Sequence, residues 1–310
     1  QMYTDFKDYG WDSDKHCQKI YQGYTTKIEK DVVISTWQSI YKMPRKYFDQ
    51  FGCVIGDEAH MFKAKSLTGI MTKLNQCKYR FGLTGTLDGT QTHQLVLEGL
   101  FGAVKKVVTT KELIDKNTLA NLKIKCVILK HDSIREKMTY AEELEYLVTN
   151  EKRTDFVVNL LRHLNGNTLC LYQLVEKHGK ILNDKMKDCE NVYFVYGGTD
   201  TSEREKIRGL VEKQTKSTTI ASYGTFSTGI NIRNIHNIVL ASPSKSKIRV
   251  LQSIGRGLRT SSNKDSVLVY DIADDISYND RRNFTLNHFT ERLNIYNEEQ
   301  FDYDISKVKL

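Results

Sequence analysis

Short apolar runs rich in β-branched residues alternate with helical stretches along most of this sequence of 310 residues, and no other feature constrains its fold as strongly. Such runs are typical of strands buried on both faces of a sheet, and helices between them are typical of parallel crossover connections. We expect strands at 32–35, 53–56, 79–83, 104–108, 168–172, 192–195, 218–221, 237–241 and 267–272. We expect helices at 66–74, 152–164, 176–186, 201–213, 247–258 and 280–297. The pattern therefore predicts an α/β fold built on parallel sheets.

The length and the distribution of these elements predict two domains. A domain takes roughly 100–200 residues, and the five strands of the second group make an α/β unit by themselves. The charged, weakly patterned stretch between Thr109 and Asn150 is the expected boundary. We therefore expect a first domain over 1–110, a connection over 111–150 that begins the second domain, and a second domain over 151–310 that closes with a helical tail.

Composition narrows the class of protein. Lysine and arginine number 46 and aspartate and glutamate 38, so the formal charge is +8, which favours a polyanionic partner. The six cysteines are scattered without a CxxC pair, and we expect reduced thiols. No apolar run approaches the roughly 18 residues of a membrane helix, and the start carries no signal-peptide pattern. We expect a soluble cytoplasmic protein that does not enter a membrane.

Two acids and a histidine follow the strand expected at 53–56: Asp57, Glu58 and His60, with Ala59 between. Ligands of parallel sheets gather outside the carboxyl ends of the strands, which is where these side chains fall. An aspartate there can hold the Mg²⁺ of a nucleotide, and the adjacent glutamate can orient or deprotonate an attacking water. Taken alone, the string is also compatible with a solvated acidic turn.

The strand expected at 79–83 ends in Thr84, Gly85 and Thr86, whose hydroxyls can hydrogen-bond across an interdomain cleft. An ordinary strand-to-turn transition is the alternative. Other short segments offer hydroxyls, amides or open backbone to a nucleic-acid strand, or form plain turns: Thr36, Trp37, Gln38, Gly197 and Gly198. The indole of Trp37 can stack on a base or pack in a core.

Three side chains share one face of the helix expected at 247–258, because Gln252, Arg256 and Arg259 are spaced i, i+4, i+7. Planar guanidinium groups bind phosphate oxygens bidentately, so this face suits a polyphosphate. Two glycines in this helix each cost about 1 kcal/mol relative to alanine, which indicates a requirement other than helix stability. The alternative is a solvated basic face.

The segment 221–232 follows the strand expected at 218–221 and is rich in glycine, serine and threonine. We expect a loop that offers backbone N–H groups and hydroxyls to the phosphates of a nucleotide or a nucleic acid.

Considered in order, these segments resemble the motif series of superfamily 2 helicases, most of all the phage UvsW-type helicases. Asp57–His60, Thr84–Thr86, 221–232 and Gln252–Arg259 resemble motifs II, III, V and VI. Thr36–Gln38 resembles motif Ib, and 169–179 with 196–198 resembles motifs IV and IVa. The resemblance spans about 32–259 and continues more loosely through the tail.

The resemblance implies two RecA-like domains that bind ATP between them and grip a nucleic-acid strand across both. It implies an ATP-hydrolysing helicase (EC 3.6.4 type) that remodels branched DNA or R-loops in recombination, repair and replication, in the host cytoplasm if phage-encoded. A double-strand DNA translocase without strand separation, and a nucleic-acid-binding module without ATPase activity, are the alternatives.

Residue roles follow from the same resemblance. Asp57 and Glu58 hold Mg²⁺, through water, and Glu58 is the catalytic base. Coupling between nucleotide and nucleic acid falls to His60, Thr84 and Thr86. Arg256 and Arg259 act as arginine fingers beside Gln252, and both arginines contact ATP together with Gly229 and Asn231. The residues implied to contact nucleic acid are Thr36, Trp37, Gln38, Gly197, Gly198, Tyr223 and Thr225.

Two departures from the family pattern stand out. Asn231 occupies a position where many relatives carry an acid, which puts its ATP contact in question. No GxxxxGK[ST] loop occurs, and the only Gly-Lys pair, Gly179-Lys180, lies inside an expected helix. That loop cradles the phosphates, and its lysine contacts them. Because the family places it before motif Ib, we expect it upstream of Gln1, in an N-terminal segment of the same protein, and we expect the first domain to be truncated.

Overall fold

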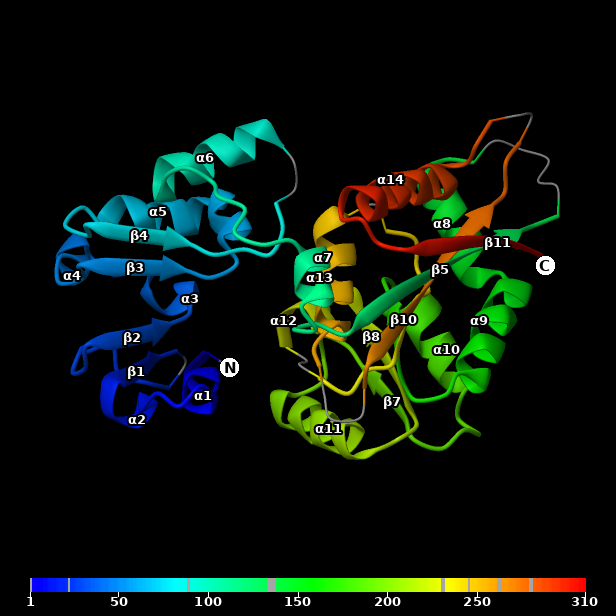
Figure 1. The fold of residues 1–310 in the computed structure, drawn as a ribbon, viewed down its shortest axis with the longest axis horizontal. Coiled ribbons are helices and arrows are strands. Elements are labelled where there is room, and N and C mark those ends of the chain that lie inside the picture. Colours follow the sequence, from blue (N-terminus) through cyan, green and yellow to red (C-terminus); the bar gives the residue numbers. More distant parts are fainter. Residues whose placement is uncertain are drawn as a thin grey trace. The chain divides into compact units, whose positions relative to one another are not determined.

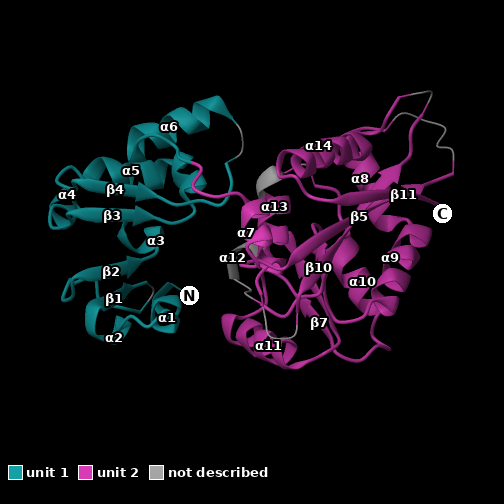
Figure 2. Cartoon of the chain, viewed as in Figure 1, with its two compact units in different colours: residues 1–105 teal, residues 106–310 magenta. Residues whose placement is uncertain are grey.

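The computed structural model describes residues 2–21, 23–87, 90–132, 138–229, 232–244, 246–260, 264–278 and 281–310, without the side chains of 227–229, 247 and 248 (Figure 1). The chain divides into two compact units, unit 1 over Gln1–Lys105 and unit 2 over Lys106–Leu310 (Figure 2). We describe each unit by itself.

Unit 1 holds two small parallel sheets. One pairs β1 (Cys17–Ile20) with β2 (Val32–Ser35), and the other pairs β3 (Cys53–Gly56) with β4 (Tyr79–Gly82). The helical elements of unit 1 are α1 (Met2–Asp8), α2 (Ser13–His16), α3 (Trp37–Ile40), α4 (Arg45–Phe48), η1 (Ala59–Lys63), α5 (Lys65–Lys73) and α6 (Gln91–Phe101).

An apolar cluster joins α5, α6 and η1 to the face of the β3–β4 sheet that carries Val54. Gly82 is required there, because a Cβ at this position would lie 2.9 Å from the ring of Phe101. The opposite face of the same sheet is open. Ile55 and Phe81 are partners across the two strands, and their side chains are 59% and 52% exposed. The β3–β4 sheet is therefore buried on one side only.

Unit 2 contains a seven-stranded sheet in the order β11-β5-β10-β9-β6-β8-β7, in which every pairing is parallel. Its strands are β5 (Asn121–Lys130), β6 (Asn167–Tyr172), β7 (Val192–Val195), β8 (Ser217–Ser222), β9 (Asn237–Leu240), β10 (Ser266–Asp275) and β11 (Tyr303–Lys309). Because all strands run the same way, their carboxyl ends lie along one edge of the sheet.

Helices accompany both faces of this sheet (Figure 1). They are α7 (Thr110–Asp115), α8 (Tyr140–Thr149), α9 (Glu151–His163), the π-helix η2 (Val175–Gly179), α10 (Lys180–Asp184), α11 (Thr201–Lys213), α12 (Tyr223–Gly229), α13 (Lys247–Gly257) and α14 (Phe284–Glu298). Strand β5 shows the two-sided burial: Ile124 and Cys126 belong to the cluster under α11–α14, and Val127 and Leu129 belong to the cluster under α9 and α10. Unit 2 thus has a core on each face of its sheet.

The fold corrects four of our expectations. Residues 104–108 form no strand, and the side chain of Val107 is 90% exposed. The stretch expected to be weakly patterned contains β5, and the tail continues beyond its expected helix into β11, which pairs with β5. The segment 223–229, expected to be a loop, is the helix α12. Among the described residues, no helix is long and apolar enough to cross a membrane.

Candidate functional site

The acidic turn of unit 1 follows β3 directly. Glu58 adopts a left-handed conformation, with φ 48° and ψ 49°, which costs a residue with a side chain roughly 1–2 kcal/mol. Its backbone N–H donates to Asp57 Oδ1 at 2.9 Å, and the N–H of Ala59 donates to the carbonyl of Leu83 at 2.8 Å. The turn is therefore fixed to the end of β4, with Asp57 exposed and Glu58 half-buried. Strain of this kind is concentrated at functional sites.

A hydrogen-bonded series connects this turn to the end of β4. His60 Nδ1 lies 3.3 Å from Glu58 Oε2 and 3.0 Å from Thr84 Oγ1. The hydroxyl of Thr84 donates to the carbonyl of Thr86 at 3.0 Å and accepts from the N–H of Thr86 at 3.3 Å. Because the carboxylate only accepts and the hydroxyl proton is used on Thr86, Nδ1 of His60 is the protonated nitrogen. The structure thus brings Glu58, His60, Thr84 and Thr86 together.

The acidic turn fits Mg²⁺ by the chemistry of its donors. Carboxylate oxygens are hard ligands, and Mg²⁺ bound with a nucleotide takes only one or two carboxylates besides phosphate oxygens and water. Within the described ranges, no three histidine, cysteine, aspartate or glutamate side chains gather as a metal cluster. The pair Asp57 and Glu58 therefore suits an ion that shares its ligands with a phosphate.

Thr36, Trp37 and Gln38 lie at the start of α3, just after β2, and all three are exposed. The indole of Trp37 is 38% exposed and meets the ring of Tyr41 edge-on, with centroids 5.6 Å apart. Thr36 Oγ1 lies 2.9 Å from Ser39 Oγ. This turn can offer a ring face and polar groups to a ligand.

In unit 2, helix α12 buries two of the residues expected to contact nucleic acid. Tyr223 and Thr225 are only 4% exposed each. The hydroxyl of Tyr223 donates to the carbonyl of Ser242 at 3.1 Å, and Thr225 Oγ1 lies 2.7 Å from Ser222 Oγ. Ser222 Oγ also accepts from the N–H of Thr225 at 3.3 Å, which favours a helix over an open loop. Neither side chain is therefore open to a ligand in this structure.

Gly197 and Gly198 follow β7 in an exposed turn. Arg204 Nη2 donates to the carbonyls of Tyr196, at 3.3 Å, and Gly197, at 3.0 Å, so the turn is held from helix α11. A Cβ at Gly198 would lie 2.6 Å from the ring of Tyr196. The turn therefore depends on glycine and keeps its backbone open.

Gln252, Arg256 and Arg259 lie on or just after α13, and each is half-buried. The guanidinium of Arg256 donates to the carbonyl of Phe226 and lies 5.3 Å from the centroid of the Phe226 ring, which ties α13 to α12. A Cβ at Gly257 would lie 2.5 Å from Ile238 Cδ1, so close packing on β9 explains this glycine. Gly229 closes α12, and Asn231 lies outside the described residues.

A buried lysine that the sequence reasoning missed holds the end of this helix. Lys264 is 3% exposed and donates to the carbonyls of Gly257, at 2.6 Å, and Arg233, at 2.7 Å. Burial lowers the pKa of Lys264 to about 8, against the opposing effect of Glu212. It therefore joins the end of α13 to the segment that follows 221–232. A single lysine after the arginine motif carries no periodic signal that would have identified it.

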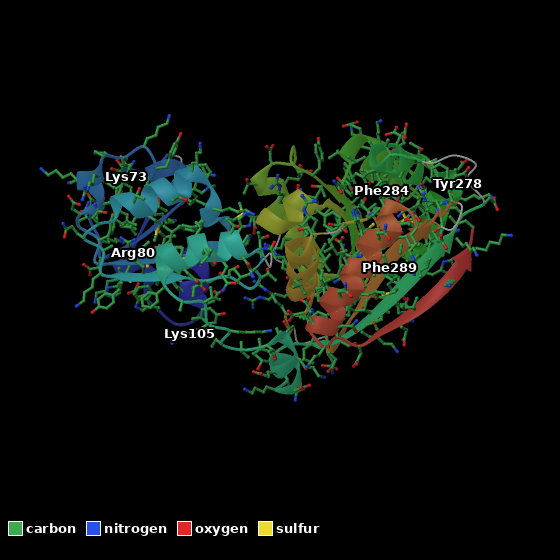
Figure 3. All side chains as sticks on the ribbon, turned by 90° about the horizontal axis from the view of Figure 1, so that it is seen from above. Lys73, Arg80, Lys105, Tyr278, Phe284 and Phe289 are labelled. Carbon is green, nitrogen blue, oxygen red and sulfur yellow. The ribbon has the colours of Figure 1, made fainter. Side chains whose placement is uncertain are left out.

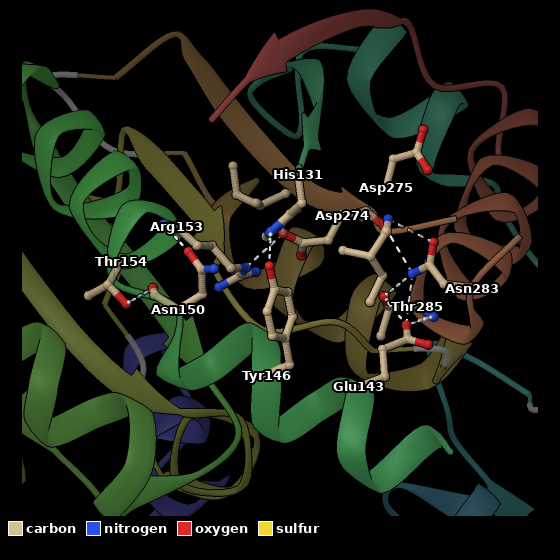
Figure 4. A network of polar contacts seen from close by, with 12 residues as sticks. His131, Glu143, Tyr146, Asn150, Arg153, Thr154, Asp274, Asp275, Asn283 and Thr285 are labelled. Atoms are coloured by element: carbon tan, nitrogen blue, oxygen red, sulfur yellow. Dashed lines mark hydrogen bonds and ion pairs between the residues drawn. The ribbon is translucent and has the colours of Figure 1, made fainter. Parts of the chain in front are cut away.

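Two buried acids of β10 anchor further charged groups. Asp271 accepts from Arg292 Nε at 2.8 Å and Nη2 at 2.7 Å, while Arg292 Nη1 donates to the carbonyl of Ser244, in the loop before α13. Asp274 accepts from Arg153 Nε at 2.8 Å and lies 2.9 Å from His131 Nε2 (Figure 4). The sequence analysis did not predict these pairs; an acid within the apolar run 267–272, Asp271, is the signal that could have indicated one of them.

The arrangement provides two sets of groups that suit phosphate chemistry. Unit 1 presents a carboxylate pair backed by a histidine and two threonines, and unit 2 presents a Gln/Arg/Arg face on a helix. Carboxylates suit a metal ion and a water, and guanidinium groups suit phosphate oxygens. Each set is held by contacts within its own unit.

Comparisons with protein-family models give two matches. The model described as "Type III restriction enzyme, res subunit" matches residues 1–89, and the model described as "Helicase conserved C-terminal domain" matches residues 151–261.

The chain is similar to curated helicases. It is 35% identical to the ATP-dependent DNA helicase uvsW of Enterobacteria phage T4, over 100% of this chain and 66% of that protein. It is 22% identical to a probable helicase of Escherichia phage T5, over 79% of this chain and 54% of that protein. The chain thus spans about two thirds of the first of these relatives and about half of the second.

Solved structures show the same similarity. The crystal structure of T4 UvsW matches with a TM-score of 0.54 and 34% identity, over 100% of this chain and 65% of that one. A fragment of a putative HsdR subunit of a type I restriction enzyme from Vibrio vulnificus YJ016 matches with a TM-score of 0.69 and 17% identity, over 94% of this chain and 55% of that one. The second likeness concerns the fold alone.

Proposed function

The chain belongs to the superfamily 2 helicases, with their RecA-like fold, and from this premise we propose that the protein is an ATP-hydrolysing motor that acts on nucleic acid. The finer proposal is a helicase that remodels branched DNA or R-loops in recombination, repair and replication. The similarity to the uvsW helicase over the whole of this chain supports it.

The observation that carries the proposal is the series Glu58–His60–Thr84 in unit 1. Glu58 Oε2 lies 3.3 Å from His60 Nδ1, which lies 3.0 Å from Thr84 Oγ1. A carboxylate placed to accept a proton from water is thereby joined to the turn after the next strand. We propose that Glu58 is the general base and that a shift of the Thr84–Thr86 turn changes its position, which would couple hydrolysis to movement along a strand.

Asp57 would hold Mg²⁺ with Glu58, directly or through water. The ion, when bound, neutralises charge on the β- and γ-phosphates. In this proposal the residues of the chain do the remaining work at this turn: Asp57 fixes the backbone of Glu58 through its hydrogen bond at 2.9 Å, and Glu58 orients the water.

Unit 2 would supply the positive charge for the transition state. We assign Arg256 and Arg259 as arginine fingers, with Gln252 beside them and the backbone of Gly229 near the nucleotide, and we keep Asn231 as a predicted contact. Fingers of this kind contribute roughly 10³–10⁵ in rate in related enzymes. Helix α13 packs closely on β9, and Lys264 bonds to the carbonyl of Gly257 at its end. These contacts support the proposal because they fix the helix that carries Gln252 and Arg256.

Hydrolysis also needs a phosphate-binding loop with its lysine, which none of the 310 residues supplies. We assign this loop to a segment of the whole protein outside this sequence. The share of the uvsW helicase that the chain spans, 66%, is consistent with such a segment.

The test is Glu58→Gln in the whole protein. We expect turnover of ATP in the presence of forked DNA to fall by about 10²–10⁴, because the amide cannot accept a proton, while nucleotide binding is retained. Glu29→Gln is the control, because Glu29 is an exposed glutamate of the same unit. Steady-state ATPase assays and equilibrium binding of a fluorescent nucleotide provide the two measurements.

Three outcomes would revise the proposal. Unchanged turnover in Glu58→Gln would remove its assigned role. Robust hydrolysis by the 310-residue chain alone would contradict the need for an outside loop. Displacement of a triplex strand without unwinding of forked DNA or an R-loop would indicate a double-strand DNA translocase instead.

A further inference from the structure

Two exposed aromatic rings stand together on unit 2, where large apolar side chains are mostly buried. Tyr140 and Phe284 are 39% and 43% exposed, and their ring centroids are 6.2 Å apart at an interplanar angle of 76°. They are the first residues of helices α8 and α14. Figure 3 shows Phe284 toward one end of α14, near Tyr278, whereas Phe289 of the same helix is 3% exposed and belongs to the core. The exposure of Phe284 is therefore not a property of the whole helix.

A buried carboxylate fixes the two helix starts to each other. Glu143 of α8 is 1% exposed and accepts from the backbone N–H groups of Phe284, at 2.9 Å, and Thr285, at 2.6 Å (Figure 4). Asn283 Nδ2 also donates to Glu143, at 2.8 Å. The start of α8 is closed by its own capping box, between Thr139 and Glu142. The backbone positions that carry both rings are therefore fixed before any ligand arrives, and carboxylates already satisfy both helix starts.

Two arginines precede the ring of Phe284 closely in the sequence. Arg281 and Arg282 are exposed and precede Phe284 by three and two residues. Arg281 and Tyr278 exchange backbone hydrogen bonds of 2.9 and 3.1 Å, which fixes the approach to α14. The ring of His288 lies 5.4 Å from that of Tyr140. We call Tyr140, Arg281, Arg282, Phe284 and His288 the Tyr140–Phe284 surface.

The surface lies at the carboxyl edge of the sheet. Strand β10 ends at Asp275, and Asn283, next to Phe284, donates to the carbonyl of Asp274 and accepts from the N–H of Ile276. The turns after β7 and β8, which the resemblance assigns to nucleic acid, lie at the same edge because all pairings are parallel. Three strand spacings separate β8 from β10, or about 14 Å.

We propose that the Tyr140–Phe284 surface binds single-stranded nucleic acid, with a base stacked on the exposed rings and Arg281 and Arg282 in contact with its phosphates. This inference rests on the proposed function and extends the nucleic-acid path beyond the family's motifs. Exposed rings beside arginines suit bases and phosphates together, and the net charge of +8 is complementary to a polyanion. These features favour a nucleic acid over a protein partner.

The first experiment measures binding of fluorescein-labelled dT oligonucleotides of increasing length to the whole protein. The variant carries Tyr140→Leu and Phe284→Leu, which remove the ring faces and keep apolar bulk. We expect wild-type affinity on the shortest oligonucleotides and at least about fivefold weaker binding on longer ones, because only a longer strand reaches from the β8 turn to the surface. The aromatic exchange Phe284→Tyr should retain affinity, and Leu210→Ala, which alters a 41% exposed side chain on α11, should change nothing.

The second experiment measures the salt dependence of binding with Arg281→Gln and Arg282→Gln combined. Loss of two phosphate contacts should reduce the slope of log affinity against log salt by about 1.4 for a single strand. This variant leaves the rings and Glu143 intact, so it tests the proposal even if the leucine variant unfolds.

The outcomes separate this inference from the proposed function. Wild-type protein that binds no oligonucleotide would overturn both. Wild-type binding that neither variant weakens at any length would overturn the surface and leave the proposed function standing. Unchanged oligonucleotide affinity together with loss of a protein partner in the leucine variant would also overturn it.

Discussion

The two units support their site residues in different ways. In unit 2, strands β6, β8 and β9 are buried at every residue, and the sheet has an apolar core on each face. In unit 1, strands β3 and β4 form a two-stranded sheet with one open face, where Ile55 and Phe81 are more than half exposed. The acidic turn of unit 1 is nevertheless held by several hydrogen bonds of its own.

This difference shows that site residues can be positioned either by local hydrogen bonds or by burial in a core. Unit 1 positions Glu58 through backbone bonds to β4 and through His60, with a core on one side of its sheet. Unit 2 positions α13 through buried charged groups of neighbouring segments, such as Arg292 and Lys264. Substitutions in the two units should therefore differ in cost, and this can be measured.

The largest difference is expected for arginine. Arg292→Leu leaves Asp271 buried without its cationic partner and should lower the free energy of unfolding of unit 2 by about 3–5 kcal/mol. The counterpart in unit 1 is Arg80→Leu, which removes one 2.7 Å bond to the carbonyl of Leu74 and should cost about 1 kcal/mol (Figure 3). Urea denaturation of both variants gives the two values. Equal costs would contradict the comparison.

A matched pair of isoleucine substitutions tests the same comparison between the two units. Ile220→Thr, at a fully buried site in β8, loses apolar contacts and buries a hydroxyl, so it should cost about 2–4 kcal/mol. Ile55→Thr, at a 59% exposed site in β3, should change stability by no more than about 0.5 kcal/mol. Thermal unfolding of the purified variants provides the measurement. A large loss for Ile55→Thr would show that its face of the sheet is covered in solution.

The last expected difference is a dependence of the stability of unit 2 on pH. Burial and the positive charge of Arg153 lower the pKa of His178 to about 3, against the opposing effect of the negative charge of Asp274. In the unfolded chain this histidine has a pKa near 6.5. Below that pH the unfolded state binds a proton that the folded state does not, so the free energy of unfolding is unaffected above pH 6.5 and falls as the pH drops toward 3. The slope reaches about 1.4 kcal/mol per pH unit, and His178→Gln should flatten it.

Unfolding as a function of pH can be measured for each unit separately. Both tryptophans, Trp11 and Trp37, lie in unit 1, so their fluorescence reports that unit, while amide hydrogen exchange reports unit 2. Asp274 adds acid sensitivity only at lower pH: burial raises its pKa, but Arg153 and the His131 hydrogen bond outweigh burial and hold it below the usual value. A loss between pH 6.5 and 5 that His178→Gln does not reduce would contradict this assignment.

Periodicity predicted the elements whose pattern is local. Strands such as β2, β3 and β7 were predicted with the bounds observed, and helix α11 was predicted residue for residue. Strand β5 was missed although its first half alternates apolar and lysine residues and its second half is an apolar run, because the stretch around it is charged and weakly patterned. Strand β11 was missed because its place beside β5 depends on pairing between residues about 180 positions apart, which local pattern does not contain.

The site residues were also predicted only where local sequence pattern identifies them. Asp57, Glu58, His60 and Thr84 were selected because they follow apolar strands, and the structure brings the side chains of Glu58, His60 and Thr84 together. The burial of Tyr223 and Thr225 was not foreseen, because glycine and serine around them suggested a loop and hid the helical spacing of Tyr223 and Phe226. Glu143 and Lys264 act on backbone groups far away in sequence, and no motif identifies such partners.

The sequence by itself determined the alternation of strands and helices, the order of the motifs and, through them, the family. These depend on residue types at short spacing, where apolar periodicity and turn chemistry act within a few residues. Only the tertiary structure decided which faces are buried, which rings are exposed and which buried charges find a partner. Those outcomes depend on the pairing order of strands and on helices packing across them, and the free energy of each contact comes from groups that meet only after the chain has folded.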